Sequence, residues 1–260
     1  MIFDTHSHYD DDAFNHDRDE LLSGLSDRGV ECLVNVGADM TSSRTALALA
    51  EQYDFVYCAL GVHPSEVEGL TEEDMAWIAD HAAHRKVVAI GECGLDYHWP
   101  EPTSDMQKKW FYRQIELAKE VSLPLIIHSR DASADTRNIL VETKAYDCGG
   151  VIHCYSYSPE MAKEYVQMGF YIGVGGVVTF KNAKKLKQTV EQIPLERIVL
   201  ETDCPYMAPE PHRGSRNDSS NLIYVAEKIA ELKGITTEEV INQTTKNAKL
   251  MYGLLKSQKE

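Results

Sequence analysis

Short runs of apolar and β-branched residues alternate with longer amphipathic segments from one end of the chain to the other. Such runs, bounded by polar or glycine-rich stretches, predict strands. The predicted strands are Ile2–His8, Glu31–Gly37, Val56–His63, Val87–Leu95, Pro124–Ser129, Gly150–Tyr155, Phe170–Gly175 and Arg197–Asp203.

The segments between these runs carry helix start and stop signals, such as Thr-Glu-Glu at residue 71 and a glycine at residue 169. The predicted helices include Thr41–Tyr53, Thr71–His84, Asp105–Val121 and Ser158–Gly169. Two further helices, Asn221–Lys233 and Thr237–Leu255, are predicted to close the chain.

The spacing of the predicted strands indicates the fold class. Successive strands end about 20 to 40 residues apart, which is the length of one strand–helix unit. Eight such units without a linker predict a single α/β domain over residues 1–260, a (β/α)8 TIM barrel with C-terminal closing helices. The alternative is an open doubly wound sheet, but no Gly-x-Gly-x-x-Gly follows the first strand, where a dinucleotide fold would place it.

Composition limits the cellular locations and the kinds of binding partner that the chain can have. The 260 residues include 26 Lys and Arg against 41 Asp and Glu, a net charge of -15, which disfavours coating duplex DNA through a broad basic face. No apolar stretch approaches membrane-spanning length, and the first residues, MIFDTHSHYD, carry no signal-peptide pattern. The six scattered cysteines form no C-x-x-C pair. We therefore expect a globular, cytoplasmic protein without membrane contact.

Ligand-type side chains gather at the predicted strand ends, which in a TIM barrel carry the catalytic groups. They are His6, His8, His63, Glu92, His128, His153 and Asp203. An isolated His-x-His pair is often a coincidental surface pair, but here, with His63 set aside, five strands would bring four histidines and two carboxylates to one mouth. Imidazole with carboxylate suits Zn, Mn, Fe or Co, and Mg where enough oxygen is present. Six ligands suffice for two metal ions if one carboxylate coordinates both. Glu92 is the expected bridging ligand, because its strand lies between the two histidine groups around the predicted barrel.

Neighbouring residues test this interpretation. Cys93, Cys154 and Cys204 each follow a predicted ligand, so strand alternation turns them outward as packing residues. The same alternation turns Asp4 and Glu201 inward, where a carboxylate could accept a hydrogen bond from a metal-bound histidine. Alternatively, Glu201 pairs with a basic residue in the barrel core.

Together these motifs resemble the TatD-type metal-dependent deoxyribonucleases of the amidohydrolase superfamily. The resemblance rests on Asp4-Thr-His-Ser-His8, Gly61-Val-His-Pro64, Gly91-Glu-Cys-Gly-Leu-Asp96, Pro124-Leu-Ile-Ile-His128, His153-Cys, Glu201-Thr-Asp203-x-Pro-Tyr206 and Arg213-Gly-Ser-Arg216-Asn217. The motifs occur in order over essentially the whole chain. The sequence departs from the family pattern at Asp218-Ser219 and at Tyr155-Ser156-Tyr157, positions that bear on substrate preference and not on the ligands.

The resemblance implies a nuclease with two divalent ions and largely 3′-to-5′ exonuclease action on DNA. By carry-over, one ion would bind His6, His8, Glu92 and Asp203, and the other Glu92, His128 and His153. His63 would face the substrate phosphate, with Arg213 or Arg216 on a flanking phosphate.

We expect hydrolysis of phosphodiester bonds at single-stranded DNA ends by water that the metal activates, with Asp203 as metal ligand and general base. The working ion would be Mg, Mn or Zn, and no obligate protein partner is evident. Four aromatic residues beyond strand ends, Tyr97, Trp99, Tyr155 and Tyr157, are candidates for stacking on bases.

Three other functions compete with this one. A binuclear amidohydrolase acting on a small molecule commonly has a carboxylated lysine where this chain has Glu92, and no Lys lies between Val87 and Trp99. Hydrolysis of the ester of an aminoacyl-tRNA could use the same centre. A metal-binding scaffold without turnover leaves six ligand-type residues at strand ends hard to explain.

Overall fold

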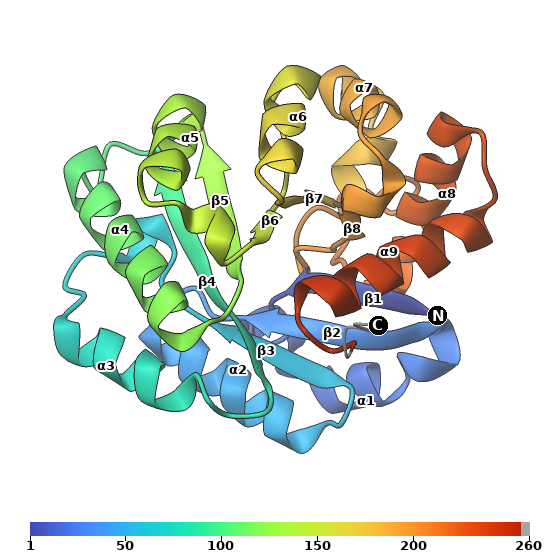
Figure 1. Cartoon of the computed structure of the whole chain (residues 1–260). Coiled ribbons are helices and arrows are strands. Elements are labelled where there is room, and N and C mark those ends of the chain that lie inside the picture. Colours follow the sequence, from blue (N-terminus) through green and yellow to red (C-terminus); the bar gives the residue numbers. More distant parts are fainter. Residues whose placement is uncertain (256–260) are drawn as a thin grey trace, which may run out of the picture. The chain divides into compact units, whose positions relative to one another are not determined.

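A computed structural model describes residues 1–255 of the chain. Its eight strands form one sheet in the order β1-β2-β3-β4-β5-β6-β7-β8, labelled in Figure 1. The strands are β1 (Ile2–Ser7), β2 (Val30–Val36), β3 (Val56–Leu60), β4 (Val87–Asp96), β5 (Leu125–Arg130), β6 (Gly150–Ile152), β7 (Tyr171–Val174) and β8 (Ile198–Leu200). Each predicted strand is present, although β3, β6 and β8 stop earlier than expected.

The helices alternate with the strands along the chain. They are α1 (Arg18–Ser23), α2 (Met40–Gln52), α3 (Glu72–His81), α4 (Ser104–Val121), α5 (Ser133–Glu142), α6 (Pro159–Gln167), α7 (Lys184–Gln192), α8 (Leu222–Lys233) and α9 (Thr237–Met251). Short 3-10 helices are η1 (Asp12–Phe14), η2 (Ser26–Arg28), η3 (Pro64–Glu66), η4 (Ala145–Asp147), η5 (Gly176–Thr179), η6 (Leu195–Arg197) and η7 (Ser219–Asn221).

Capping residues explain where several helices begin. The Thr71 side chain caps α3 in a capping box with Asp74, as its Thr-Glu-Glu start predicts. Helix α2 begins earlier than expected because Asp39, and not the Thr-Ser-Ser segment, provides its N-cap. The two closing helices are confirmed as α8 and α9, the latter capped by Thr236 with Glu239.

The element order and the parallel sheet are those of a (β/α)8 barrel, so the predicted fold class is confirmed. Among the helices of residues 1–255, none combines the length and the apolar character needed to cross a bilayer.

The described residues cluster in two compact units. The first unit comprises residues 1–34, 154–167 and 171–255, and the second comprises residues 35–153 and 168–170. A single domain over residues 1–260 stays a prediction.

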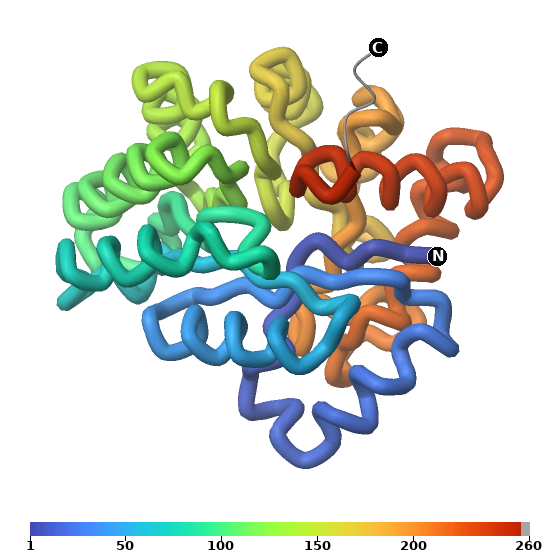
Figure 2. The backbone as a smooth tube through the Cα atoms, turned by 60° about the horizontal axis from the view of Figure 1, so that its bottom comes forward, coloured from blue at the N-terminus to red at the C-terminus, as the bar shows by residue number. Residues whose placement is uncertain are grey.

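In the first unit, α9 packs along β1, and the two elements lie side by side in Figure 1 and Figure 2. Thr245 of α9 donates a hydrogen bond to the Met1 carbonyl oxygen at 3.0 Å. The Asn247 amide of the same helix donates to the carbonyls of Leu195 and Ile198, where β8 starts. These bonds hold the starts of β1, which contains His6 and leads to His8, and of β8, which leads to Asp203.

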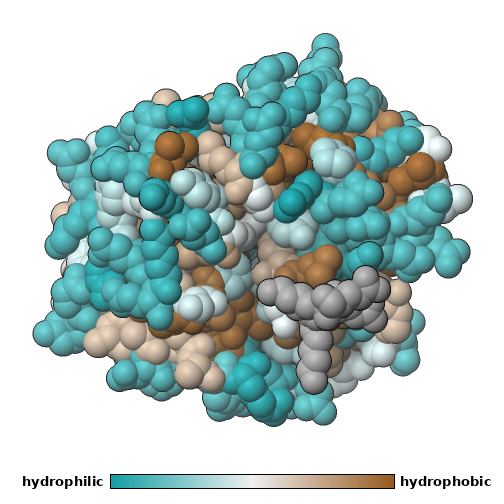
Figure 3. Space-filling model, in the orientation of Figure 1, coloured by the Kyte–Doolittle hydropathy of each residue, from teal (hydrophilic) through white to brown (hydrophobic). Residues whose placement is uncertain are grey.

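In the second unit, β3, β4, β5 and β6 pair in parallel. Gly94 of β4 lies opposite His128 of β5, and the position requires glycine because a Cβ there would be only 2.0 Å from the His128 carbonyl oxygen. Helix α4 buries Trp110 and Phe111, while the side chains it exposes are mostly hydrophilic (Figure 3).

At the amino-terminal ends of β3 and β4, the Lys86 ammonium is buried and donates to three backbone carbonyls, at 2.7 to 2.9 Å. The acceptors belong to Tyr53, Asp54 and Val56. The bonds compensate the charge for its loss of water and join the start of β4 to the segment that leads into β3.

Candidate metal sites

The first unit brings together three residues predicted as metal ligands. His6 lies in β1, His8 follows that strand, and their Nε2 atoms are 3.0 Å apart. Asp203 Oδ1 is 3.4 Å from His8 Nε2 and 3.8 Å from His6 Nε2. One ligand atom from each residue therefore lies within 4.8 Å of the others. Because His6 and His8 are two residues apart on an extended chain, their imidazoles lie on the same side of it, as predicted.

A turn, and not strand alternation, places Asp203. Strand β8 ends at Leu200, and the amides of Thr202 and Asp203 both donate to the His6 carbonyl oxygen, at 3.3 and 2.9 Å. Asp203 itself has a φ of 57°, in the left-handed region. The carboxylate thus reaches the histidines because the turn is bonded to β1.

The second unit gathers three histidines around one carboxylate oxygen. The Oε1 atom of Glu92 lies 2.8 Å from His128 Nδ1, 3.2 Å from His153 Nε2 and 3.7 Å from His63 Nε2. His63, His128 and Glu92 each offer a ligand atom within 4.8 Å of the others. His63, which the resemblance placed against the substrate phosphate, therefore lies among the potential ligands.

Asp96 is a site residue that the sequence analysis did not single out. Its Oδ2 is 3.0 Å from His128 Nε2, and its Oδ1 accepts the His98 amide at 2.9 Å. The Gln107 side chain bonds both its backbone N–H and its carbonyl. Residues 92, 94 and 96 alternate on one side of β4, so strand periodicity alone predicts a second carboxylate on the same side as Glu92.

Burial and neighbours separate the two histidines that flank Glu92. Burial lowers the pKa of His63 from 6.5 to about 4, so this imidazole is neutral at neutral pH. Burial also lowers the pKa of His128, but hydrogen bonds to Asp96 and Glu92 outweigh it and raise the pKa above its usual range. His128 thus lies between two carboxylates, whose hydrogen bonds favour its protonated form.

Both groups fit a divalent metal ion by their donor chemistry. Two imidazole nitrogens 3.0 Å apart, and an imidazole nitrogen 2.8 Å from a carboxylate oxygen, can approach so closely only with a proton or a cation between them. A divalent ion can replace that proton, because neutral imidazole and carboxylate are ligands for Zn, Mn, Fe and Co.

Asp4 is fully buried, and its hydrogen-bond donors are not the histidine ring that the sequence predicts. The buried carboxylate accepts the backbone amides of His6 and Thr202 and the hydroxyls of Thr202 and Ser219. Burial raises its pKa from 3.8 to about 7, although these hydrogen bonds act in the opposite direction. Asp4 thus connects β1 to the two segments beyond β8.

Glu201 is buried, and its Oε1 accepts the Cys154 amide at 2.5 Å. A Cβ at position 173 would be 2.3 Å from Glu201 Oε2, so a glycine there makes room for the carboxylate. Cys93 and Cys204 are fully buried, in keeping with packing roles, whereas Cys154 is half-buried with a φ of 46°.

The two arginines proposed for phosphate contacts differ in what they bind. Arg216 donates to both carboxylate oxygens of Asp17, at 2.7 and 2.5 Å, and to the Ala13 carbonyl. Arg213 is exposed, with its guanidinium 4.3 Å from the Phe180 ring centre. The geometry therefore gives Arg216 a structural ion pair and leaves Arg213 as the better phosphate candidate.

The four aromatic candidates for stacking differ in exposure. Trp99 is 58% exposed, as a stacking surface requires. Tyr155 is buried, with its hydroxyl bonded to the Ser158 carbonyl, so the expectation for Tyr155 is wrong: its ring is used in packing. Tyr97 is half-buried and donates to Asp135, and Tyr157 is half-buried.

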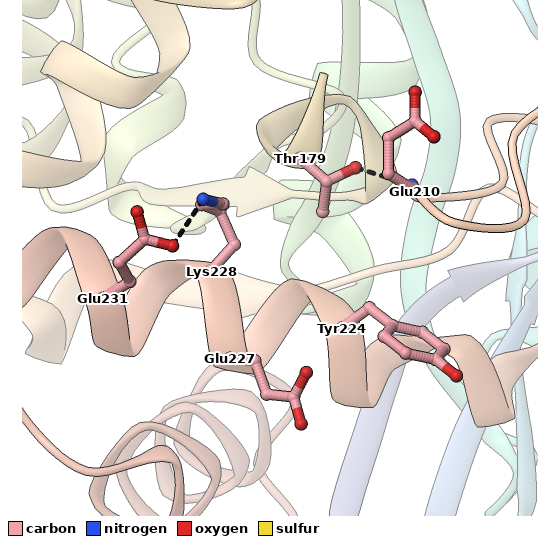
Figure 4. A pocket seen from close by; sticks show the side chains of 6 residues that line it. All are labelled: Thr179, Glu210, Tyr224, Glu227, Lys228 and Glu231. Atoms are coloured by element: carbon pink, nitrogen blue, oxygen red, sulfur yellow. Dashed lines mark hydrogen bonds and ion pairs between the residues drawn. The ribbon is translucent and has the colours of Figure 1, made fainter. Parts of the chain in front are cut away.

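The first unit also contains a shallow pocket on α8, shown in Figure 4. Its lining consists of Thr179, Glu210, Tyr224, Glu227, Lys228 and Glu231. Lys228 is paired with Glu231, and the Glu210 amide donates to Thr179. Because carboxylates dominate the lining, this pocket repels phosphate and is not a candidate for the nucleic acid site.

Comparison with known proteins also indicates a metal-dependent hydrolase. The sequence profile described as TatD related DNase matches residues 3–253. A Bacillus subtilis protein named "Uncharacterized metal-dependent hydrolase YabD" is 50% identical over 252 residues, covering 97% of this chain and 99% of the relative. A Shigella flexneri protein named "3'-5' ssDNA/RNA exonuclease TatD" is 32% identical over 261 residues, covering 97% and 99% of the two chains.

Among solved structures, the crystal structure of the TatD homologue YJJV from Escherichia coli K12 matches with a TM-score of 0.91 at 30% identity. The match covers 97% of this chain and 98% of that one. A fold shared at this level, a family profile spanning the chain and two histidine–carboxylate groups lead to one conclusion. The chain belongs to the TatD related DNase family of metal-dependent hydrolases.

Proposed function

We propose that this protein is a divalent-metal-dependent deoxyribonuclease that removes nucleotides from the 3′ end of single-stranded DNA. The observation that carries the proposal is the pair of histidine–carboxylate groups, one built on His6, His8 and Asp203 and one on Glu92 with its histidines. The name of the Shigella flexneri relative supports a single-stranded nucleic acid as the substrate.

In this proposal His6, His8 and Asp203 hold one ion, and His128 and His153 with Glu92 hold the other. Glu92 as a ligand shared by both ions stays a prediction from the sequence. Bound divalent ions supply charge neutralisation for the phosphodiester and a lowered pKa for attacking water.

The remaining tasks fall to the side chains of this chain. Asp203 accepts the proton of the attacking water, since its carboxylate is 19% exposed and so within reach of solvent. His63, neutral at neutral pH, donates a hydrogen bond to a non-bridging phosphate oxygen or ligates the second ion. Arg213 pairs with a flanking phosphate.

The net charge of -15 fits an enzyme that acts on strand ends better than one that follows a duplex. Because the acidic surface repels DNA, binding relies on the ions and on a few local groups. A cytoplasmic location stays a prediction from the sequence.

The test incubates metal-depleted protein with a 5′-labelled single-stranded oligonucleotide and adds Mg, Mn or Zn in turn. We expect a ladder of shortened products with at least one metal, and its loss in Glu92→Gln and in Asp203→Asn. Glu116→Gln, on the exposed side of α4, is the matched control and keeps wild-type activity. An oligonucleotide blocked at its 3′ end should resist.

Absence of cleavage with every metal, in protein that binds metal, would refute the proposal. Hydrolysis of a lactone, a cyclic amide or an aminoacyl-tRNA ester by the same preparation would then assign the site to one of the competing reactions.

A further inference from the structure

An exposed aromatic ring stands close in sequence to one of the metal-binding groups. Tyr206 is 57% exposed, although a tyrosine ring ordinarily packs much of its apolar surface against the protein. It lies three residues after Asp203 and ends the motif Glu201-Thr-Asp203-x-Pro-Tyr206. Neither the proposed metal ligands nor the proposed phosphate contacts assign it a task.

Hydrogen bonds restrain Tyr206 both at its backbone and at its hydroxyl group. The Tyr206 amide donates to the Asp203 carbonyl at 2.9 Å, and the Asn217 side chain donates to the Tyr206 carbonyl at 2.8 Å. The Tyr206 hydroxyl donates to Asp11 Oδ2 at 3.0 Å, and the Asp11 amide donates to the His8 carbonyl at 3.1 Å. The ring therefore joins the segment that carries Asp203 to the segment that follows His8, with much of its surface open to solvent.

The backbone around Tyr206 adopts costly conformations. Asp203 and Met207 have φ values of 57° and 56°, and for residues other than glycine the left-handed region costs about 1 to 3 kcal/mol each. Buried Asn217 maintains the turn, because its amide bonds the carbonyls of both Thr202 and Tyr206. Backbone conformations of this kind cluster at functional sites.

We propose that Tyr206 is a stacking surface for the nucleobase of the nucleotide whose phosphate is bound at His6, His8 and Asp203. The inference rests on the proposed nuclease function and adds the residue that recognises the base. A ring held at both ends loses little conformational entropy when a base stacks on it. Stacking tolerates every base, because each has a π-face, and hydrogen bonds to base edges are not required.

The test compares two oligonucleotides that differ in one terminal base, one intact and one abasic at its 3′-terminal nucleotide. We expect wild-type kcat/KM to favour the intact strand about tenfold, as stacking on one aromatic ring predicts. Tyr206→Ala should lose this preference, and Tyr206→Phe should keep most of it, because the phenyl ring preserves the stacking face and loses only the restraint at Asp11. Tyr146→Ala, at an exposed tyrosine preceding β6, is the matched control and keeps it.

Two further measurements separate stacking from a structural role. Metal content and the thermal unfolding midpoint should be unchanged in Tyr206→Ala, and the dissociation constants of phosphorothioate versions of both oligonucleotides should show the same lost preference. An unaltered preference in Tyr206→Ala, or an equal loss of activity on both strands, would overturn the inference. If the wild type cleaves neither strand, the proposed function fails, and the ratio of the two dissociation constants still decides for or against stacking.

Discussion

Replacement of Asp96 by Asn tests how the second unit prepares His128 for a metal ion. In the wild type, Asp96 Oδ2 lies 3.0 Å from His128 Nε2, and a proton shared there keeps Nε2 protonated. The lone pair of a neutral His128 is then on Nδ1, which faces Glu92 Oε1 at 2.8 Å. Asp96 therefore selects the tautomer that a metal ion beside Glu92 requires.

The structure sets the size of the expected effect. Oδ1 of Asp96 already accepts the His98 amide, so an asparagine that keeps this bond must turn its NH2 group toward His128. That donor favours the wrong tautomer, with the proton on Nδ1. If the asparagine amide is flipped, its NH2 group instead faces the backbone N–H of His98, so that two donors meet. Either arrangement loses one hydrogen bond to a charged group, about 1.5 to 3 kcal/mol, and we expect metal affinity to fall roughly 10- to 100-fold.

Metal titration against a chromophoric chelator measures this affinity directly, and wild type, Asp96→Asn and the exposed control Asp105→Asn would be compared at the same pH. Ion binding at the group of His6, His8 and Asp203 in the first unit provides an internal reference, since the side-chain hydrogen bonds of Asp96 are to His128 and His98 in the second unit. An Asp96→Asn affinity within twofold of wild type at every site would refute the reasoning.

Three further predictions concern stability and pH. Lys86→Met should lower the free energy of unfolding by about 3 kcal/mol in urea titrations, because three backbone carbonyls, that of Val56 buried, lose a charged donor; a change below 1 kcal/mol would contradict this. The pKa of His63 is depressed from 6.5 to about 4, so its contribution to the free energy of unfolding is present above pH 6.5 and is lost as the pH falls toward 4. Over this window the metal-free wild type should lose about 3 kcal/mol more stability than His63→Gln. Parallel curves of stability against pH for the two proteins would exclude this contribution. Asn217→Ala should free the turn that Asn217 bonds at Thr202 and Tyr206, costing about 2 kcal/mol and lowering metal-dependent activity more than metal content.

The sequence alone determined the positions of the eight strands and the residues at their ends. A buried strand is a local feature, because a run of apolar and β-branched residues predicts it without knowledge of its neighbours. The parallel order then follows from the alternation with helices, and that order places chemistry at the carboxyl ends of strands. For this reason the sequence could associate His6 with His8 and predict Glu92 as a ligand.

The tertiary structure decided which of these side chains meet and what else they contact. Asp203 reaches the histidines through a left-handed turn bonded to β1, and no strand periodicity describes such a turn. Arg216 is engaged by Asp17, nearly 200 residues earlier in the chain, and a pairing at that separation leaves no local pattern. The hydrogen bonds of Asp96 to His128 and of Tyr206 to Asp11 join residues far apart in the chain, so only the structure shows them. The course of a turn, the rotamer of a side chain and the burial of a ring depend on packing between distant segments, which the order of residues along the chain does not display.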